Sequence, residues 1–105
     1  ESDSDSKEWR ENIDQLRAKI DVIDENIIYA LGTRLKVSRQ IGEYKKNNNV
    51  AIVPAVRWDS LMAKVVEKGY ENGLSEKFLT DVFNAIHEAS VEVQNEIISG
   101  KSSEQ

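Results

Sequence analysis

The sequence contains no cysteine, one histidine and one proline among its 105 residues, and only 7% of its residues are aromatic. Without cysteine the chain has no disulfide, no thiolate zinc site and no cysteine nucleophile, and a cytoplasmic location is favoured. A single histidine excludes a metal site built from several histidines. So few prolines and aromatic residues favour long helices over a sheet. No stretch approaches the roughly 20 apolar residues of a membrane span, and the sequence shows no signal-peptide core.

The chain also lacks an excess of positive charge, because 14 Lys and Arg against 19 Asp and Glu give a formal net charge of −5. Proteins that bind nucleic acids or anionic membranes without specificity rely on excess positive charge, so we expect neither as a partner. A negatively charged ligand would need a local cationic pocket. The length predicts a single domain. Since the chain begins without an initiator methionine, we expect a processed product or a domain of a longer protein.

Apolar residues that recur three and four positions apart predict a first helix of about 40 residues, over residues 7–46. Two shorter helices are expected over residues 54–71 and 75–99. Asn72-Gly73 is expected to end the second helix, and Ser75 to cap the third. The predicted fold class is therefore all-α, with one very long and two shorter helices per chain.

The helical domain is expected to cover residues 7–98, between a disordered leader of residues 1–6 and a disordered tail of residues 99–105. Its long helix would measure about 60 Å, against a compact diameter of roughly 26 Å for a domain of this size. Because two shorter helices cannot cover the whole apolar stripe, we expect a homodimer in which the long helices span both protomers. The alternative is a long helix that bends at Gly32 or Gly42.

Cations interrupt the apolar stripe of the long helix. Arg34 lies seven residues after Ile27 and Lys45 four residues after Ile41, so both point with the apolar face, and Arg17 lies at its edge. Buried cations are costly unless they are paired, so this cluster predicts an anionic ligand. For each cation taken alone, the alternative is a side chain that reaches solvent or pairs with a nearby carboxylate.

The third helix shows the same feature, because Ser90 and Gln94 occupy core positions between Ile86 and Ile97. His87 has no second histidine four residues away, so we interpret it as structural or partly exposed. The sequence contains no phosphate-binding or dinucleotide-binding glycine motif and no paired nucleophile and base. We therefore expect a helical pocket lined by cations and neutral hydrogen-bond donors, with no metal and no cofactor.

These residues resemble the all-helical, type II chorismate mutase family. The matching segments extend over about residues 7–98 and are residues 16–24, Arg34, residues 41–45, residues 54–57, Gly73-Leu74 and residues 86–94. The resemblance implies an intertwined homodimer of three-helix chains that converts chorismate to prephenate in phenylalanine and tyrosine biosynthesis. It also suggests a chain fused to another enzyme of the same pathway, as is common in this family.

The resemblance also implies a role for each polar residue. Catalysis would depend on Lys45, Gln94 and Arg34, with Lys45 and Gln94 donating hydrogen bonds to the ether oxygen. The substrate would be bound by six residues, Arg17, Arg34, Lys45, Arg57, Ser90 and Gln94. Of these, Arg17 would reach the site of the partner protomer, Ser90 would bind a carboxylate, and Arg57 would add positive potential.

Two positions depart from the family pattern. Trp58 follows Arg57 where many members have a Glu or Gln that helps to hold the ring hydroxyl, and Pro54 stands where an acidic residue is common. Asp59 is the nearest carboxylate, but one step along a helix turns it by about 100 degrees, so we do not expect it to substitute. Trp58 is expected in the core or in the pocket wall.

Two other functions stay open at this point. A related lyase on the same fold splits isochorismate into salicylate and pyruvate, and the cations alone do not separate it sharply from a mutase. The loop between Lys45 and Arg57 favours the mutase. The second alternative is a non-catalytic helical dimerisation or regulatory module, which predicts apolar or solvent-facing residues where Arg34, Lys45 and Gln94 stand.

Overall fold

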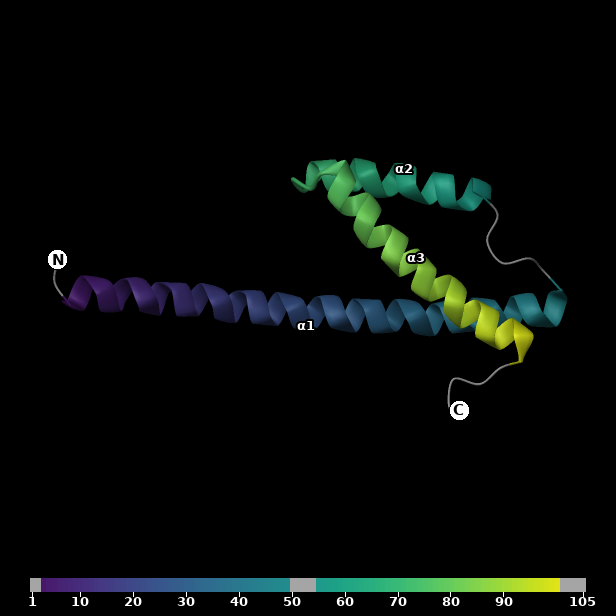
Figure 1. Cartoon of the computed structure of the whole chain (residues 1–105), viewed down its shortest axis with the longest axis horizontal. Helices are drawn as coiled ribbons and strands as arrows, with labels where there is room; N and C mark the ends of the chain where they lie inside the picture. Colours follow the sequence, from purple (N-terminus) through teal and green to yellow (C-terminus); the bar gives the residue numbers. More distant parts are fainter. Residues whose placement is uncertain (1–2, 50–54, 101–105) are drawn as a thin grey trace. The chain divides into compact units, whose positions relative to one another are not determined.

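The computed structural model describes residues 3–49 and 55–100, and in these ranges it contains three helices and no strand (Figure 1). They are α1 (Asp3–Asn48), α2 (Ala55–Glu71) and α3 (Glu76–Ser99). The predicted all-α class, with one very long and two shorter helices, is therefore confirmed. None of the helices in these ranges is long and apolar enough to span a membrane.

The boundary of α1 differs from the prediction. The helix begins at Asp3 rather than at residue 7, so residues 3–6 of the expected leader are helical. Once a helix is nucleated, each added residue gains a hydrogen bond at little further cost, so polar residues can extend it. Residues 1–2 and 101–105 of the expected leader and tail, and the expected start of the second helix at Pro54, lie outside the described residues.

The turn between α2 and α3 forms as its residues predict. Gly73 has a φ of 77°, in the left-handed region that glycine adopts without a steric penalty. The Leu74 N–H donates to the Gly69 carbonyl at 2.8 Å, which satisfies a carbonyl at the end of α2. Ser75 is the N-cap of α3, and its hydroxyl oxygen accepts a hydrogen bond from the Phe78 N–H at 3.1 Å.

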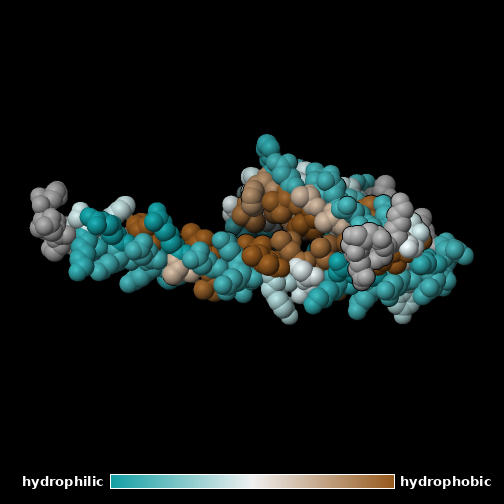
Figure 2. Space-filling view, turned by 60° about the horizontal axis from the view of Figure 1, so that its bottom comes forward, coloured by the Kyte–Doolittle hydropathy of each residue, from teal (hydrophilic) through white to brown (hydrophobic). Residues whose placement is uncertain are grey.

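The chain divides into two compact units, Glu1–Thr33 and Arg34–Gln105. The first unit consists of the N-terminal part of α1, and most of its large apolar side chains are exposed. Leu16, Ile20, Ile23 and Ile27 keep 50–54% of their surface accessible. Figure 2 shows hydrophobic residues at the surface of this part of the helix, between hydrophilic ones. The apolar stripe predicted from the sequence is present here as an exposed surface.

The second unit consists of the C-terminal part of α1 together with α2 and α3. Within the described residues Leu79 is the one apolar side chain in the buried class, at 6% exposure. The predicted inner face of α2 is half-buried and comprises Trp58, Leu61, Met62, Val65 and Val66. The buried side chains that α1 and α3 contribute besides Leu79 are polar, namely Ser38, Ser90 and Gln94. These buried polar residues locate the candidate site.

Gly69 makes the contact between α2 and Leu79 possible, and we predict that Gly69→Ala is destabilising. A Cβ at this position would overlap the Leu79 side chain, so the buried Leu79 would have to change its conformation or the helices would have to separate. Overpacking of this kind lowers the free energy of unfolding by about 1–3 kcal/mol. Urea unfolding measures the change, with Gly32→Ala as the matched helical control.

No atom lies within 4 Å of a Cβ added at Gly32. Gly32→Ala is therefore expected to raise the free energy of unfolding by about 0.5–1 kcal/mol through helix propensity alone. Equal effects of the two substitutions would contradict the packing role of Gly69.

Candidate active site

The C-terminal part of α1 and the middle of α3 bring their polar side chains together. Arg34 and Ser38 lie one turn apart on α1 and both reach Ser90 on α3. The Arg34 Nη1 donates to the Ser90 Oγ at 2.6 Å, and the Ser38 Oγ donates to the same oxygen at 3.0 Å. Two turns further along α1, the Lys45 Nζ donates to the Gln94 Oε1 at 3.2 Å. The polar residues that interrupt the two apolar stripes are therefore partners of one another.

A glycine sets the close approach of the two helices beside the last of these pairs. Gly42 is buried, and a Cβ added to it would lie 3.2 Å from the Cα of Gln94. Any other residue would push against the backbone of α3 at the position that carries the Gln94 side chain. Gly42 therefore fixes the separation at which Lys45 and Gln94 meet.

A cavity of about 390 Å³ lies within the second unit. The five hydrogen-bonded side chains line it, namely Arg34, Ser38, Lys45, Ser90 and Gln94. Proteins bind small molecules in cavities of this order. The remaining lining residues come from all three helices and are Ile41, Arg57, Trp58, Leu61 and His87. The rings of Trp58 and His87 contact each other, with centroids 4.3 Å apart and planes inclined by 38°.

The charged side chains that line the cavity are cations. Arg34, Lys45 and Arg57 line it, and no Asp or Glu is among the described lining residues. Burial lowers the pKa of Lys45 below its ordinary value. Burial also lowers the pKa of Arg34, and the nearby charge of Arg57 lowers it further. Both shifts reflect the cost of removing these cations from water, and a cavity wall that carries several cations favours an anionic ligand.

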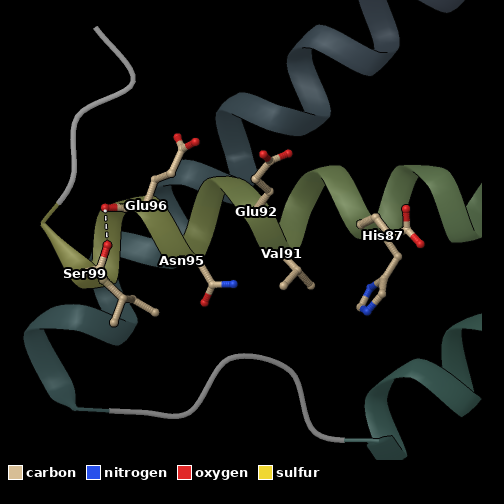
Figure 3. A pocket seen from close by; sticks show the side chains of 8 residues that line it. His87, Val91, Glu92, Asn95, Glu96 and Ser99 are labelled. Atoms are coloured by element: carbon tan, nitrogen blue, oxygen red, sulfur yellow. Dashed lines mark hydrogen bonds between the residues drawn. The ribbon is translucent and has the colours of Figure 1, made fainter. Parts of the chain in front are cut away.

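A neighbouring groove along α3 is lined by negative rather than positive charges. His87 lines both the groove and the cavity, but the groove is also lined by Glu88, Glu92 and Glu96. In Figure 3, His87, Val91 and Asn95 project from one side of α3, whereas Glu92 and Glu96 project from another. In the part of the chain that the structure describes, no cluster of three or more His, Cys, Asp or Glu is arranged to hold a metal ion. Because glutamates line the groove and cations line the cavity, an anion is drawn to the cavity rather than to the groove.

Five of the six predicted substrate-binding residues line the one cavity, namely Arg34, Lys45, Arg57, Ser90 and Gln94. The sixth, Arg17, is exposed in the first unit and is not among the lining residues. Trp58 forms part of the cavity wall, as expected. Asp59, which we did not expect to serve the site, lines a separate groove with residues of α2 and α3.

Sequence reasoning did not predict two polar lining residues, Ser38 and His87. Ser38 could have been found, because it is a polar residue on the apolar stripe four positions after Arg34. His87 was interpreted as structural or partly exposed, and it is half-buried. Its place in the lining depends on its contact with Trp58 on another helix, and nothing in the local sequence indicates that contact.

Comparison with known proteins points to one family. A model of the family described as chorismate mutase type II matches residues 16–95. The chain is 34% identical over 83 residues to the "Bifunctional chorismate mutase/prephenate dehydratase" of Buchnera aphidicola subsp. Schizaphis graminum (strain Sg). This alignment covers 79% of the chain and 22% of the relative, so the chain spans about a fifth of that protein.

A second relative is the "4-amino-4-deoxychorismate mutase" of Streptomyces pristinaespiralis, which is 28% identical over 87 residues. That alignment covers 83% of the chain and 67% of the relative. No solved structure gives a significant match. Because the family model covers well over half of the sequence, the chain belongs to the chorismate mutase type II family.

Proposed function

We propose that this chain rearranges chorismate to prephenate. The observation that carries the proposal is the convergence of Arg34, Lys45 and Arg57 on one small cavity that no described carboxylate lines. Chorismate is a dicarboxylate, and such a cavity supplies the positive charge that it needs. Family membership supports the same activity.

The reaction suits a site without a nucleophile. The ether C–O bond breaks while a C–C bond forms within the same molecule, so no group is transferred to the protein and no proton has to move. Acceleration comes from holding the compact conformer of the substrate and from stabilising the negative charge that develops on the ether oxygen. Arg34 presents a planar fork of donors that matches a carboxylate.

The Lys45–Gln94 hydrogen bond orients the donors for the ether oxygen. Because the Gln94 Oε1 accepts from the Lys45 Nζ, the amide nitrogen of Gln94 stays available as a donor. The ammonium of Lys45 has three N–H groups, so it can bind Gln94 and a ligand together. We assign both side chains to the ether oxygen, while Ser90 binds a carboxylate and Arg57 adds positive potential.

We propose a homodimer in which the exposed stripe of α1 is covered by a second copy, with Arg17 contributed across the interface. The exposure of Leu16, Ile20, Ile23 and Ile27 supports it. The bifunctional relative supports a domain of about residues 7–98 within a longer protein of phenylalanine and tyrosine biosynthesis.

The test is the disappearance of chorismate at neutral pH without added metal or cofactor, with prephenate identified as the product. Isochorismate is run in parallel, because salicylate and pyruvate would indicate the lyase instead. No turnover of either substrate by the folded protein would contradict the proposal and favour a regulatory module.

The second relative suggests a further candidate, the rearrangement of 4-amino-4-deoxychorismate. A protonated amino group on the ring would meet a cavity lined by Arg34, Lys45 and Arg57 and by no described carboxylate. We therefore expect kcat/KM for the amino compound to be lower than for chorismate. The reverse order would make the amino compound the preferred substrate.

Mixed dimers test the proposed position of Arg17. We predict that Arg17→Ala and Lys45→Met chains are each inactive alone but regain about a quarter of the wild-type activity when they are unfolded together and refolded. Half of the dimers are then mixed, and one of the two sites in each mixed dimer has both Lys45 and the partner's Arg17. If Arg17 served its own chain, every site would lack one of the two residues, so mixing would restore nothing.

A further inference from the structure

We propose that Ser38 is a positioning residue that aims the Ser90 hydroxyl at the ligand, an inference that rests on the proposed function. Ser38 and Ser90 are both buried, at 5% and 6% exposure, and both line the cavity. A serine hydroxyl has one O–H donor and two acceptor lone pairs. The environment of Ser90 therefore decides whether it acts on a ligand as a donor or as an acceptor.

Two donors converge on the Ser90 oxygen. The Arg34 Nη1 donates to it at 2.6 Å and the Ser38 Oγ at 3.0 Å, so both acceptor positions are occupied. What Ser90 can still offer is its own O–H. A donor in a cationic cavity binds a carboxylate oxygen, whereas a free lone pair would repel it. Ser38 thus converts Ser90 into a committed donor without touching the ligand itself.

The position of Ser38 on α1 explains why it fills this role. It lies one turn after Arg34 and one turn before Gly42, on the face that packs against α3. Arg34 alone would leave one lone pair of Ser90 open, and the hydroxyl could then rotate between donating and accepting. We expect loss of Ser38 to weaken substrate binding more than the chemical step.

A double-mutant cycle of Ser38→Ala and Ser90→Ala tests the inference. Ser38→Ala is expected to raise KM for chorismate about three- to tenfold, the value of one neutral hydrogen bond, with kcat changed less than twofold. In the Ser90→Ala background the same substitution is expected to change nothing, because Ser38 acts only through Ser90. Equal effects of Ser38→Ala in the two backgrounds would overturn the proposal.

The same double-mutant cycle can be measured through stability, without substrate. The unfolding midpoints of the wild type, the two single variants and the double variant report the Ser38–Ser90 hydrogen bond directly. The shift in the unfolding midpoint of the double variant is expected to be smaller than the sum of the two single shifts. Additive shifts would show that no hydrogen bond between Ser38 and Ser90 stabilises the fold. A wild type that turns over no chorismate, with non-additive midpoints, would overturn the proposed function and leave the Ser38–Ser90 pair established.

The contact of Trp58 with His87 carries a second, independent inference. Within residues 3–49 and 55–100 the His87 ring is held by Trp58 and has no hydrogen-bond partner, although it lines the cavity. The other polar lining residues of α1 and α3 are already bonded to one another, Arg34 and Ser38 to Ser90, and Lys45 to Gln94. His87 is the polar lining residue of α3 whose side chain is not already bonded to another lining residue in this way.

We infer that His87 is a specificity-determining residue that hydrogen-bonds the ring hydroxyl of the substrate. The proposed function assigns the cationic groups to the carboxylates and the ether oxygen, which leaves the hydroxyl without a partner among them. A ring nitrogen serves a hydroxyl well, since it either donates or accepts. The contact with the Trp58 ring restrains the imidazole, so the hydrogen bond needs less further ordering.

His87→Phe keeps the ring contact with Trp58 and removes both nitrogens. We expect kcat/KM for chorismate to fall about three- to tenfold. For an analogue with hydrogen in place of the ring hydroxyl, the variant and the wild type should agree within twofold. An equal loss with both substrates would show a packing role, and no loss with either would show no contact, so each result would overturn the inference. No turnover by the wild type would instead overturn the proposed function.

Discussion

Lys45→Met is expected to lower kcat for chorismate about 10²–10³-fold at neutral pH, the cost of removing one donor to an oxygen that gains charge. Methionine keeps the length of the side chain but removes the ammonium that meets Gln94 at 3.2 Å. The helical fold should be retained, and loss of the Lys45–Gln94 hydrogen bond should lower the melting temperature only modestly. The measurements are initial rates and a melting curve.

Lys46→Met is the matched control, because Lys46 is the next residue on α1 and is exposed. It should leave kcat within twofold of the wild type. An equal loss in the two variants would mean that the positive charge at the end of α1, rather than the ammonium in the cavity, is responsible. Retained activity in Lys45→Met would contradict the role assigned to Lys45.

The pH profile of kcat/KM provides an independent check on the same residue. The donor is the protonated ammonium, and burial lowers its pKa from the ordinary value of 10.5. Activity should therefore persist at neutral pH and decline as the pH rises through the lowered pKa, at a midpoint below 10.5. A profile that declines only at the ordinary lysine value would show that Lys45 is not desolvated in the working enzyme.

Arg34→Ala is expected to lower kcat/KM about 10–100-fold, mostly through KM, because hydrogen bonds to charged groups contribute more than neutral ones. The guanidinium bonds Ser90 at 2.6 Å, so its loss also releases the hydroxyl beside it. Arg34→Lys should give an intermediate result, because it keeps the charge and loses the planar fork.

Arg39→Ala is the control for Arg34, since Arg39 is an exposed arginine on the same helix. Its kinetic constants should match the wild type. If Arg34→Lys equals the wild type, the fork geometry is irrelevant and the residue contributes charge alone.

The sequence predicted most of the secondary structure because the relevant signals are local. The spacing of apolar residues indicates the helices. Gly73 determines the turn through its backbone conformation, and Ser75 through capping of α3. The start of α1 was predicted too late, because no stop signal precedes the apolar stripe and helix extension costs little.

The candidate site was predictable where polar residues interrupt an apolar stripe. Arg34 and Lys45 on α1, and Ser90 and Gln94 on α3, stood out in this way, and the structure pairs them. His87 was not predictable, because its place in the wall depends on an aromatic contact between two helices. Such contacts are set by packing over long sequence separations, which periodicity does not report.

The small interior of the second unit has a consequence for handling the protein. Leu79 is the one apolar side chain of the described residues in the buried class, and large apolar residues of the first unit are exposed. With so little apolar surface buried, the single chain gains little stability from burial within itself. In the proposed dimer, association supplies the missing burial, so melting temperature and specific activity should both fall on dilution. Assays at low enzyme concentration would then underestimate the activity of the assembled form.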